Sequence, residues 1–171
     1  AKHVGSDGKR EYQKYDNTQV RLMGYFRSGN NLEWNASLGM KQDRTYKYGY
    51  EPQTLVFSPD SLKQQFQTIS GRVGFHNINK TDFGLTYSPD VKIDVFSDNH
   101  DNSESNTVVN LPLEKTIGKE FAVNLGLTFD LTRVSPKGKA AINNTMYYIS
   151  PSVLYKTGNI NVQAGIRPSW D

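Results

Sequence analysis

The sequence predicts an all-β fold, an antiparallel up-and-down meander of about eight strands. Three observations predict it. Apolar and polar residues alternate over several segments, turn sequences rich in Gly and Asn separate these segments, and the connections are alternately short and long. Because successive side chains of a strand point to opposite faces, each segment forms a strand with one apolar face.

The segment 121–131 shows the alternation most clearly. Apolar residues occupy every second position, with small or polar residues between them: Phe121, Val123, Leu125, Leu127, Phe129 and Leu131. Ten steps of about 3.3 Å give a length of about 33 Å, and a tilt of roughly 40° gives a height of about 25 Å. That height matches the apolar band of an outer-membrane β-barrel.

The remaining strands are predicted, in chain order, at residues 18–28, 32–42, 66–78, 83–95, 107–115, 147–155 and 160–166. Turn sequences such as Ser28-Gly29-Asn30-Asn31 favour tight hairpins, because Gly and Asn tolerate a positive φ. Pro89 interrupts the strand at 83–95, since proline cannot donate to a β-ladder. Longer connections are expected at 43–65, 97–106 and 134–142.

The predicted domains are a polar N-terminal loop or tether at 1–17 and a β-barrel segment at 18–171. In a meander, alternate connections lie at opposite ends of the sheet, and outer-membrane barrels have short turns at one end and long loops at the other. We therefore expect a slice of such a barrel, or a small barrel, in the bacterial outer membrane. Its partners would be outer-membrane lipid and the rest of the parent barrel.

Composition excludes several classes of function. The 171 residues contain no Cys, which excludes thiolate metal sites, disulfides and Cys nucleophiles. No apolar stretch approaches the roughly 18 residues that a membrane-spanning helix needs. The net charge is only +3 and no basic run exceeds Lys9-Arg10, so we expect no nucleic-acid partner.

Tyr46, Tyr48 and Tyr50 are the candidate ligand-binding residues, in the loop at 43–65. They suit a sugar-stacking ledge or an aromatic membrane-interface belt, but a strand extended above the membrane is the favoured interpretation. We expect no enzyme, metal or cofactor. Gly-x-Ser-x-Gly is absent, and His3, His76 and His100 lack metal-ligand spacing.

Two acidic patterns have simpler explanations than catalysis or metal binding. Asp94 and Asp130 would suit acid–base chemistry if they lay close together, but a place among the polar residues that face a lumen explains them more simply. The segment 98–104 is rich in oxygen ligands for calcium, yet it lacks the glycine and the frame of an EF-hand. A solvated loop is the favoured interpretation.

Two stretches resemble strands of a known family. The segment 143–155, with its Asn-Thr start, its Ile149-Ser150-Pro151 centre and its aromatic end, is similar to barrel strands of TonB-dependent receptor-type outer-membrane proteins. The turn at 156–159 and the strand at 162–166 continue this pattern, and the segment 65–74 also resembles such a strand. The resemblance implies the passive wall of a transporter that takes up a small ligand, with a plug domain as a further partner. The family has no fixed barrel motif for ligand residues, so none is carried over.

A second interpretation remains open at this stage. A soluble all-β binding module, such as a carbohydrate-binding sandwich, would bury the same apolar faces between two sheets. The long loops would then bind the ligand, with Trp34 and the three tyrosines as stacking residues.

Overall fold

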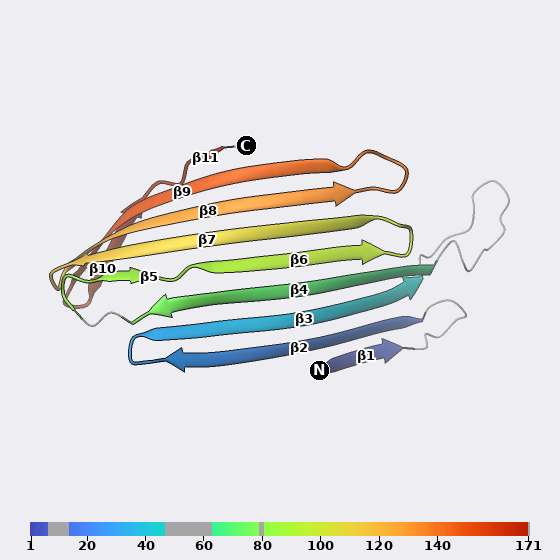
Figure 1. The fold of residues 1–171 in the computed structure, drawn as a ribbon, viewed down its shortest axis with the longest axis horizontal. Helices are drawn as coiled ribbons and strands as arrows, with labels where there is room; N and C mark the ends of the chain where they lie inside the picture. Colours follow the sequence, from blue (N-terminus) through green and yellow to red (C-terminus); the bar gives the residue numbers. More distant parts are fainter. Residues whose placement is uncertain (7–13, 47–62, 79–80, 171) are drawn as a thin grey trace.

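The computed structural model describes residues 1–6, 14–46, 63–78 and 81–170, and these form one antiparallel sheet (Figure 1). Its 11 strands are β1 (Lys2–Ser6), β2 (Tyr15–Ser28), β3 (Leu32–Tyr46), β4 (Lys63–Asn77), β5 (Leu85–Tyr87), β6 (Asp90–Asp98), β7 (Ser103–Ile117), β8 (Phe121–Ser135), β9 (Ile142–Thr157), β10 (Ile160–Gly165) and β11 (Ser169–Trp170). The predicted all-β meander is confirmed.

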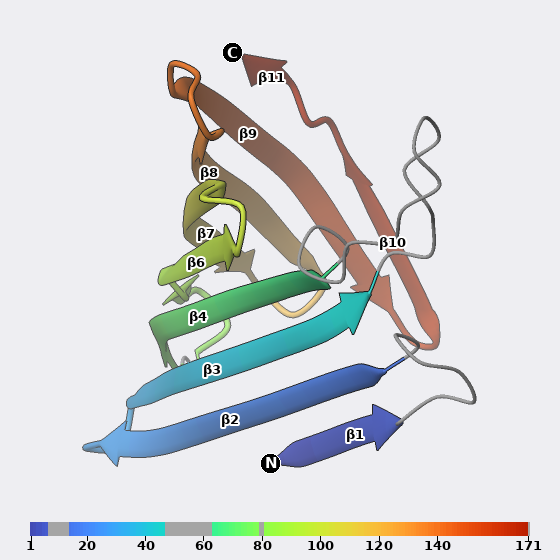
Figure 2. The ribbon, with the colours of Figure 1, turned by 90° about the vertical axis from the view of Figure 1, so that its right-hand side faces the viewer.

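The strands follow one another across the sheet in chain order. The path is β1-β2-β3-β4-β6-β7-β8-β9-β10, while β5 pairs with β7 and β11 with β9. Figure 2 shows the sheet curling from β2–β4 through β6–β8 to β9–β11. The edge strands β1 and β10 do not pair with each other within the described residues. The sheet is therefore open. The sequence was compatible with a slice of a barrel or with a small closed barrel, and the small closed barrel is not observed.

The interruption at Pro89 separates β5 from β6 without shifting the register. Tyr87 pairs with Leu113 and Asp90 pairs with Asn110, so the same alignment against β7 continues across the gap. Beside β5, the Asn77 side chain replaces part of the ladder. Its Oδ1 accepts from the Tyr87 amide at 2.6 Å and its Nδ2 donates to the Leu85 carbonyl at 2.7 Å. β5 and β6 are thus one strand interrupted where proline removes a donor.

The N-terminal segment differs from the expected loop at 1–17. Lys2–Ser6 forms β1 and pairs with Tyr15–Gln19 of β2, while residues 7–13 lie outside the described part. β1 lacks the alternation that identifies strands in a sequence, and all of its residues are exposed. Its pairing comes from the free edge of β2, which local sequence does not reveal.

We call the end of the sheet with the connections 29–31, 78–84, 118–120 and 158–159 the turn end, and the opposite end the loop end. At the turn end Gly29, Gly118 and Gly158 have φ of 64°, 72° and 52°, as tight hairpins require. At the loop end the strands run further than predicted, and the connections shrink to 99–102 and 136–141. The difference in length between the two ends is therefore smaller than the sequence suggests.

The strands are staggered in one direction across the sheet. Tyr25 of β2 is level with Tyr148 of β9 through Asn35, Gly74, Asp90, Asn110 and Thr128. β2 ends at Ser28 and β9 at Thr157, so β9 extends six residues further. Six residues of about 3.3 Å, across six strand spacings of about 4.8 Å, correspond to a tilt of about 35°. This tilt is close to that of strands in β-barrels.

Candidate functional site

The two faces of the sheet differ in chemistry along every long strand. One face, the apolar face, carries a row in which Phe26, Trp34 and Phe75 are paired in turn across β2–β4, and Leu111, Leu127 and Ile149 across β7–β9. The other, the polar face, carries Tyr25, Asn35, Asp90, Asn110 and Thr128 in the adjacent row. A shift of one residue exchanges the faces.

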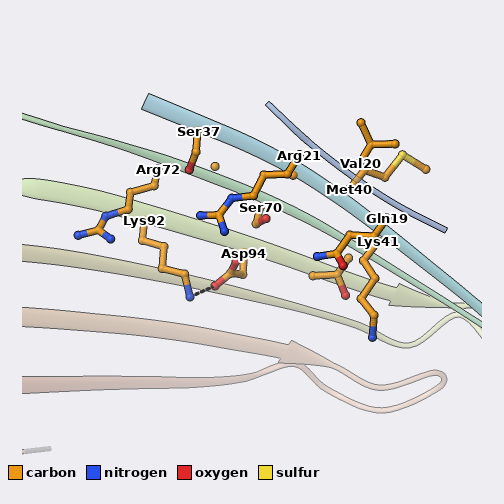
Figure 3. A pocket seen from close by; sticks show the side chains of 13 residues that line it. Gln19, Val20, Arg21, Ser37, Met40, Lys41, Ser70, Arg72, Lys92 and Asp94 are labelled. Carbon is orange, nitrogen blue, oxygen red and sulfur yellow. Dashed lines mark ion pairs between the residues drawn. The ribbon is translucent and has the colours of Figure 1, made fainter. Parts of the chain in front are cut away.

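The polar face contains a hollow of about 350 Å³ across β2, β3, β4 and β6, which we call the basic hollow. Arg21, Lys41, Arg72 and Lys92 line it, with Asp94 as the one carboxylate of the lining (Figure 3). The neutral polar groups of the lining are Gln19, Ser37, Thr68 and Ser70, and the rest consists of Val20, Met40 and two glycines. Among the charged groups of this hollow, cations therefore outnumber carboxylates.

Glycine at position 39 gives the basic hollow its shape. Arg21, Gly39, Ser70 and Asp94 are neighbours in one row across four strands. A Cβ atom on Gly39 would lie 2.6 Å from the Ser70 Oγ, so the Ser70 hydroxyl occupies the space that a side chain would fill. The Arg21 side chain thus extends beside the Ser70 hydroxyl with no side chain between them (Figure 3).

Three of the four cations have carboxylate partners. Lys92 Nζ lies 2.6 Å from Asp94 Oδ2, and Lys41 Nζ lies 2.6 Å from Asp43 Oδ2. Arg72 donates through Nε to Asp90 Oδ1 at 3.2 Å. Among the described residues Arg21 has no ion-pair partner. One positive charge in the hollow is therefore uncompensated.

A second hollow of the polar face, about 390 Å³, lies across β5 and β7–β10, and we call it the hydroxyl hollow. Its polar lining is Thr86, Ser88, Glu114, Asn124, Ser150, Ser152 and Gln163. Glu114 is its one charged side chain. The polar face therefore has a basic half and a half of neutral hydrogen-bonding groups.

Glu33 forms a separate polar cluster near the turn end. It is 8% exposed, binds the Arg27 guanidinium, and its Oε2 lies 2.9 Å from His76 Nε2. The three side chains come from β2, β3 and β4, where Arg27 pairs with Glu33 and Glu33 with His76. This ion-pair cluster joins three strands on the polar face.

Of the predicted ligand-binding tyrosines, Tyr46 ends β3 opposite Lys63 and borders a hollow of about 220 Å³ at the loop end. Tyr48 and Tyr50 lie outside the described residues. The structure therefore does not bring the three tyrosines together as a described site.

The two candidate catalytic carboxylates lie on different strands with β7 between them. Asp94 binds Lys92, and Asp130 accepts a hydrogen bond from Asn106 Nδ2 at 2.8 Å. Their strands β6 and β8 are two spacings apart, about 10 Å. Each carboxylate is explained by its own partner on the polar face.

The acidic segment at 98–104 forms a tight turn at the loop end. Asp98 accepts hydrogen bonds from the amides of His100 and Asn102 at 2.8 and 2.9 Å, and from the Asn102 side chain at 2.8 Å. Burial alone would raise the pKa of Asp98, but these hydrogen bonds hold the pKa below its ordinary value. The part of the chain that the structure describes contains no group of three His, Asp or Glu side chains placed to hold a metal ion.

Neighbouring connections bind one another around this turn. Asn99 donates to the Lys63 carbonyl at 3.0 Å and accepts from the Gln65 amide at 2.9 Å, which ties the turn to β4. On its other side, Asn102 Oδ1 accepts from the Lys137 amide at 2.9 Å. The loop end is thus joined from β4 to the connection between β8 and β9.

The apolar face is uncovered. Among the described residues Ala122 is the only buried hydrophobic one, whereas Leu22, Phe26 and Leu38 are 65–67% exposed. No second layer packs on the sheet within the described part. A surface of this kind is unusual for a soluble monomer and is typical of a lipid or protein interface.

An aromatic row borders the apolar face at the turn end, and a shorter one lies toward the loop end on β8, β9 and β11. A turn-side aromatic row consists of Phe26, Trp34, Phe75, Tyr87, Phe121 and Tyr155, and a loop-side aromatic row of Phe129, Tyr147 and Trp170. Ring centroids lie 4.7 Å apart in Trp34–Phe75 and Phe121–Tyr155, and 5.6 Å apart in Phe129–Tyr147. The eight residue steps from Phe121 to Phe129 span about 26 Å along the strand, or about 21 Å at the observed tilt.

The sequence predicted the alternation of apolar and polar residues but not the basic hollow. Arg21, Lys41, Arg72 and Lys92 are far apart in the sequence and form no basic run. Only the register brings them together. The available signal was a cation at a polar-face position on each of four successive strands.

No helix among the described residues has the length and apolar character needed to cross a membrane. No family model, curated protein or solved structure matches this chain.

Proposed function

We propose that this chain forms part of the wall of a bacterial outer-membrane β-barrel, in a TonB-dependent receptor-like transporter that takes up a small ligand. The observation that carries the proposal is the uncovered apolar face, with the turn-side aromatic row along one end and the loop-side aromatic row on β8, β9 and β11 toward the other. Outer-membrane barrels have such a band, about 25 Å tall and flanked by aromatic residues. The apolar face would contact lipid, and the polar face would line the lumen.

The geometry of the sheet gives further support. A tilt of about 35° is close to the strand tilt of closed barrels. The unpaired edges at β1 and β10 would need partner strands in lipid, because no water is present there to satisfy backbone groups. The rest of the parent barrel would supply these strands. The transport role rests on the resemblance of segments 65–74 and 143–166 to strands of the receptor family.

Two single-cysteine variants in β8 test the proposed wall directly, since the 171 residues include no native Cys that would also be labelled. Leu127→Cys and Thr128→Cys are introduced separately into the full-length protein, which is expressed in its native cell. The membranes are then isolated and treated with a water-soluble maleimide. We expect labelling of Thr128→Cys, and labelling of Leu127→Cys only after the membrane is dissolved and the protein unfolded. Recovery of the protein in the soluble fraction would contradict the proposal and favour the soluble binding module.

A further inference from the structure

We propose that the basic hollow is a binding site for a small oxyanion of the carboxylate or phosphate class, with Arg21 as its principal contact. The inference deepens the proposed function by naming a ligand class for the polar face. It depends on the proposed function in one respect, because it treats the polar face as the lining of the lumen through which the ligand passes.

The charge balance of the hollow favours an anion. Lys41, Arg72 and Lys92 each have a carboxylate partner, whereas Arg21 has none among the described residues. Its guanidinium can donate two parallel hydrogen bonds to a carboxylate or phosphate, the geometry in which arginine binds these groups best. Arg72 is held through Nε, so its terminal nitrogens have no partner among the described residues and remain available to a bound anion.

The shape of the hollow favours a molecule larger than a single ion. Its 350 Å³ is near the lower end of the range for small-molecule sites. The open space over Gly39 places the Ser70 hydroxyl beside Arg21, where it can donate to an oxygen held by the guanidinium.

The hydroxyl hollow gives an internal comparison. It has a similar volume, 390 Å³, and lies on the same face, but it contains no cation. If size and polarity alone governed binding, both hollows would serve equally. The distribution of charge assigns the anion to the basic hollow.

Isothermal titration of the folded protein with citrate and, separately, inorganic phosphate at low ionic strength tests the proposal. We expect saturable binding of at least one anion by the natural protein. Citrate alone would indicate a carboxylate ligand, and phosphate alone a phosphate ligand. Arg21→Gln should weaken binding about tenfold or more, as expected for the loss of a charge-assisted hydrogen-bonded pair.

Two further variants make the result unambiguous. Arg133→Gln removes the same charge from the apolar face of β8 and should leave the affinity within about twofold. Asp94→Asn should tighten anion binding, because it removes the carboxylate from the lining and frees Lys92. A misfolded variant would not bind more tightly, so this increase depends on the site itself.

Absence of binding for both anions would overturn the proposal, as would an equal loss in Arg21→Gln and Arg133→Gln. Because titration measures binding without reference to the lipid environment, its failure is distinguishable from failure of the membrane-wall proposal. The two single-cysteine variants in β8 test that proposal separately.

Discussion

The two faces of β8 share one backbone and differ in nearly everything else. On the apolar face, Leu125 and Leu127 lie in a continuous apolar surface that no described residue covers. On the polar face, Thr128 donates to Asn110 at 2.9 Å and Asp130 accepts from Asn106 at 2.8 Å. The comparison shows that these strands satisfy their polar side chains within the sheet and leave their apolar side chains to an outside partner.

The polar face is itself divided. Between β2 and β6 many of its groups are charged and form ion pairs within a strand or between neighbouring strands, whereas between β7 and β10 they are mostly hydroxyls and amides. A lumen lined in this way would attract an anion to one side only. The polar face therefore differs in charge from β2 to β10. The alternation of apolar and polar residues along each strand does not predict this difference.

The largest expected effect comes from a charge on the apolar face. Leu127→Arg should reduce the free energy of unfolding in lipid vesicles by about 2–4 kcal/mol, the cost of a cation at the bilayer midplane. Thr128→Arg, one residue further along, should cost about 1 kcal/mol or less, mainly its hydrogen bond to Asn110. Denaturant titration in vesicles measures both, and equal costs would contradict the assignment of the faces.

A smaller contrast is expected between two aromatic pairs. Phe121→Ala removes a ring 4.7 Å from Tyr155 on the apolar face and should cost about 2 kcal/mol in vesicles, from the ring pair and from lost apolar transfer. Phe66→Ala removes a ring 5.8 Å from Phe96 on the polar face and should cost about 1 kcal/mol. The same titration compares them. A greater cost at Phe66 would show that lipid does not contact the turn-side aromatic row.

Most of the architecture could be predicted from the sequence, because period-two alternation determines both the strand and its faces. Segment 121–131 of β8 and the turn at Gly158 follow from local residues alone. β1 could not be predicted, since it lacks alternation and pairs only because β2 offers an edge. The extension of β7 back to Ser103 was missed because its polar residues pair with β8 beyond the apolar band.

The basic hollow could not be predicted from the sequence for a related reason. Arg21 and Lys92 are separated by two strands, and only the register of β2, β3, β4 and β6 brings them into one lining. A shift of one residue in any of these pairings would separate at least one of the cations from the others by the full thickness of the sheet. Alternation identified the face correctly, but neighbours across strands depend on register.

The cluster at Glu33 sharpens the comparison within the polar face. Glu33→Gln removes the counter-charge of Arg27 and His76, so the amides of the 29–31 turn should lose protection from hydrogen exchange. The expected effect is smaller than for the aromatic pairs because the Arg27 side chain is 57% exposed. Glu114→Gln, on the same face, has no ion pair among the described residues and serves as the control. If Glu33→Gln and Glu114→Gln change the protection of these amides equally, the cluster does not stabilise the turn.

The smallest expected effect is a local pH dependence at the loop end, beyond the apolar band. The hydrogen bonds from Asn102 and His100 hold the pKa of Asp98 below its ordinary value of 3.8, despite the opposing effect of burial. A carboxylate with a depressed pKa stabilises the folded turn above its unfolded pKa, and this stabilisation is lost as pH falls through the folded pKa. Hydrogen exchange at His100 and Asn102 should therefore be slower in the natural protein than in Asp98→Asn at neutral pH. The difference should vanish well below pH 3.8, and its persistence there would show that the ionised carboxylate does not hold the turn.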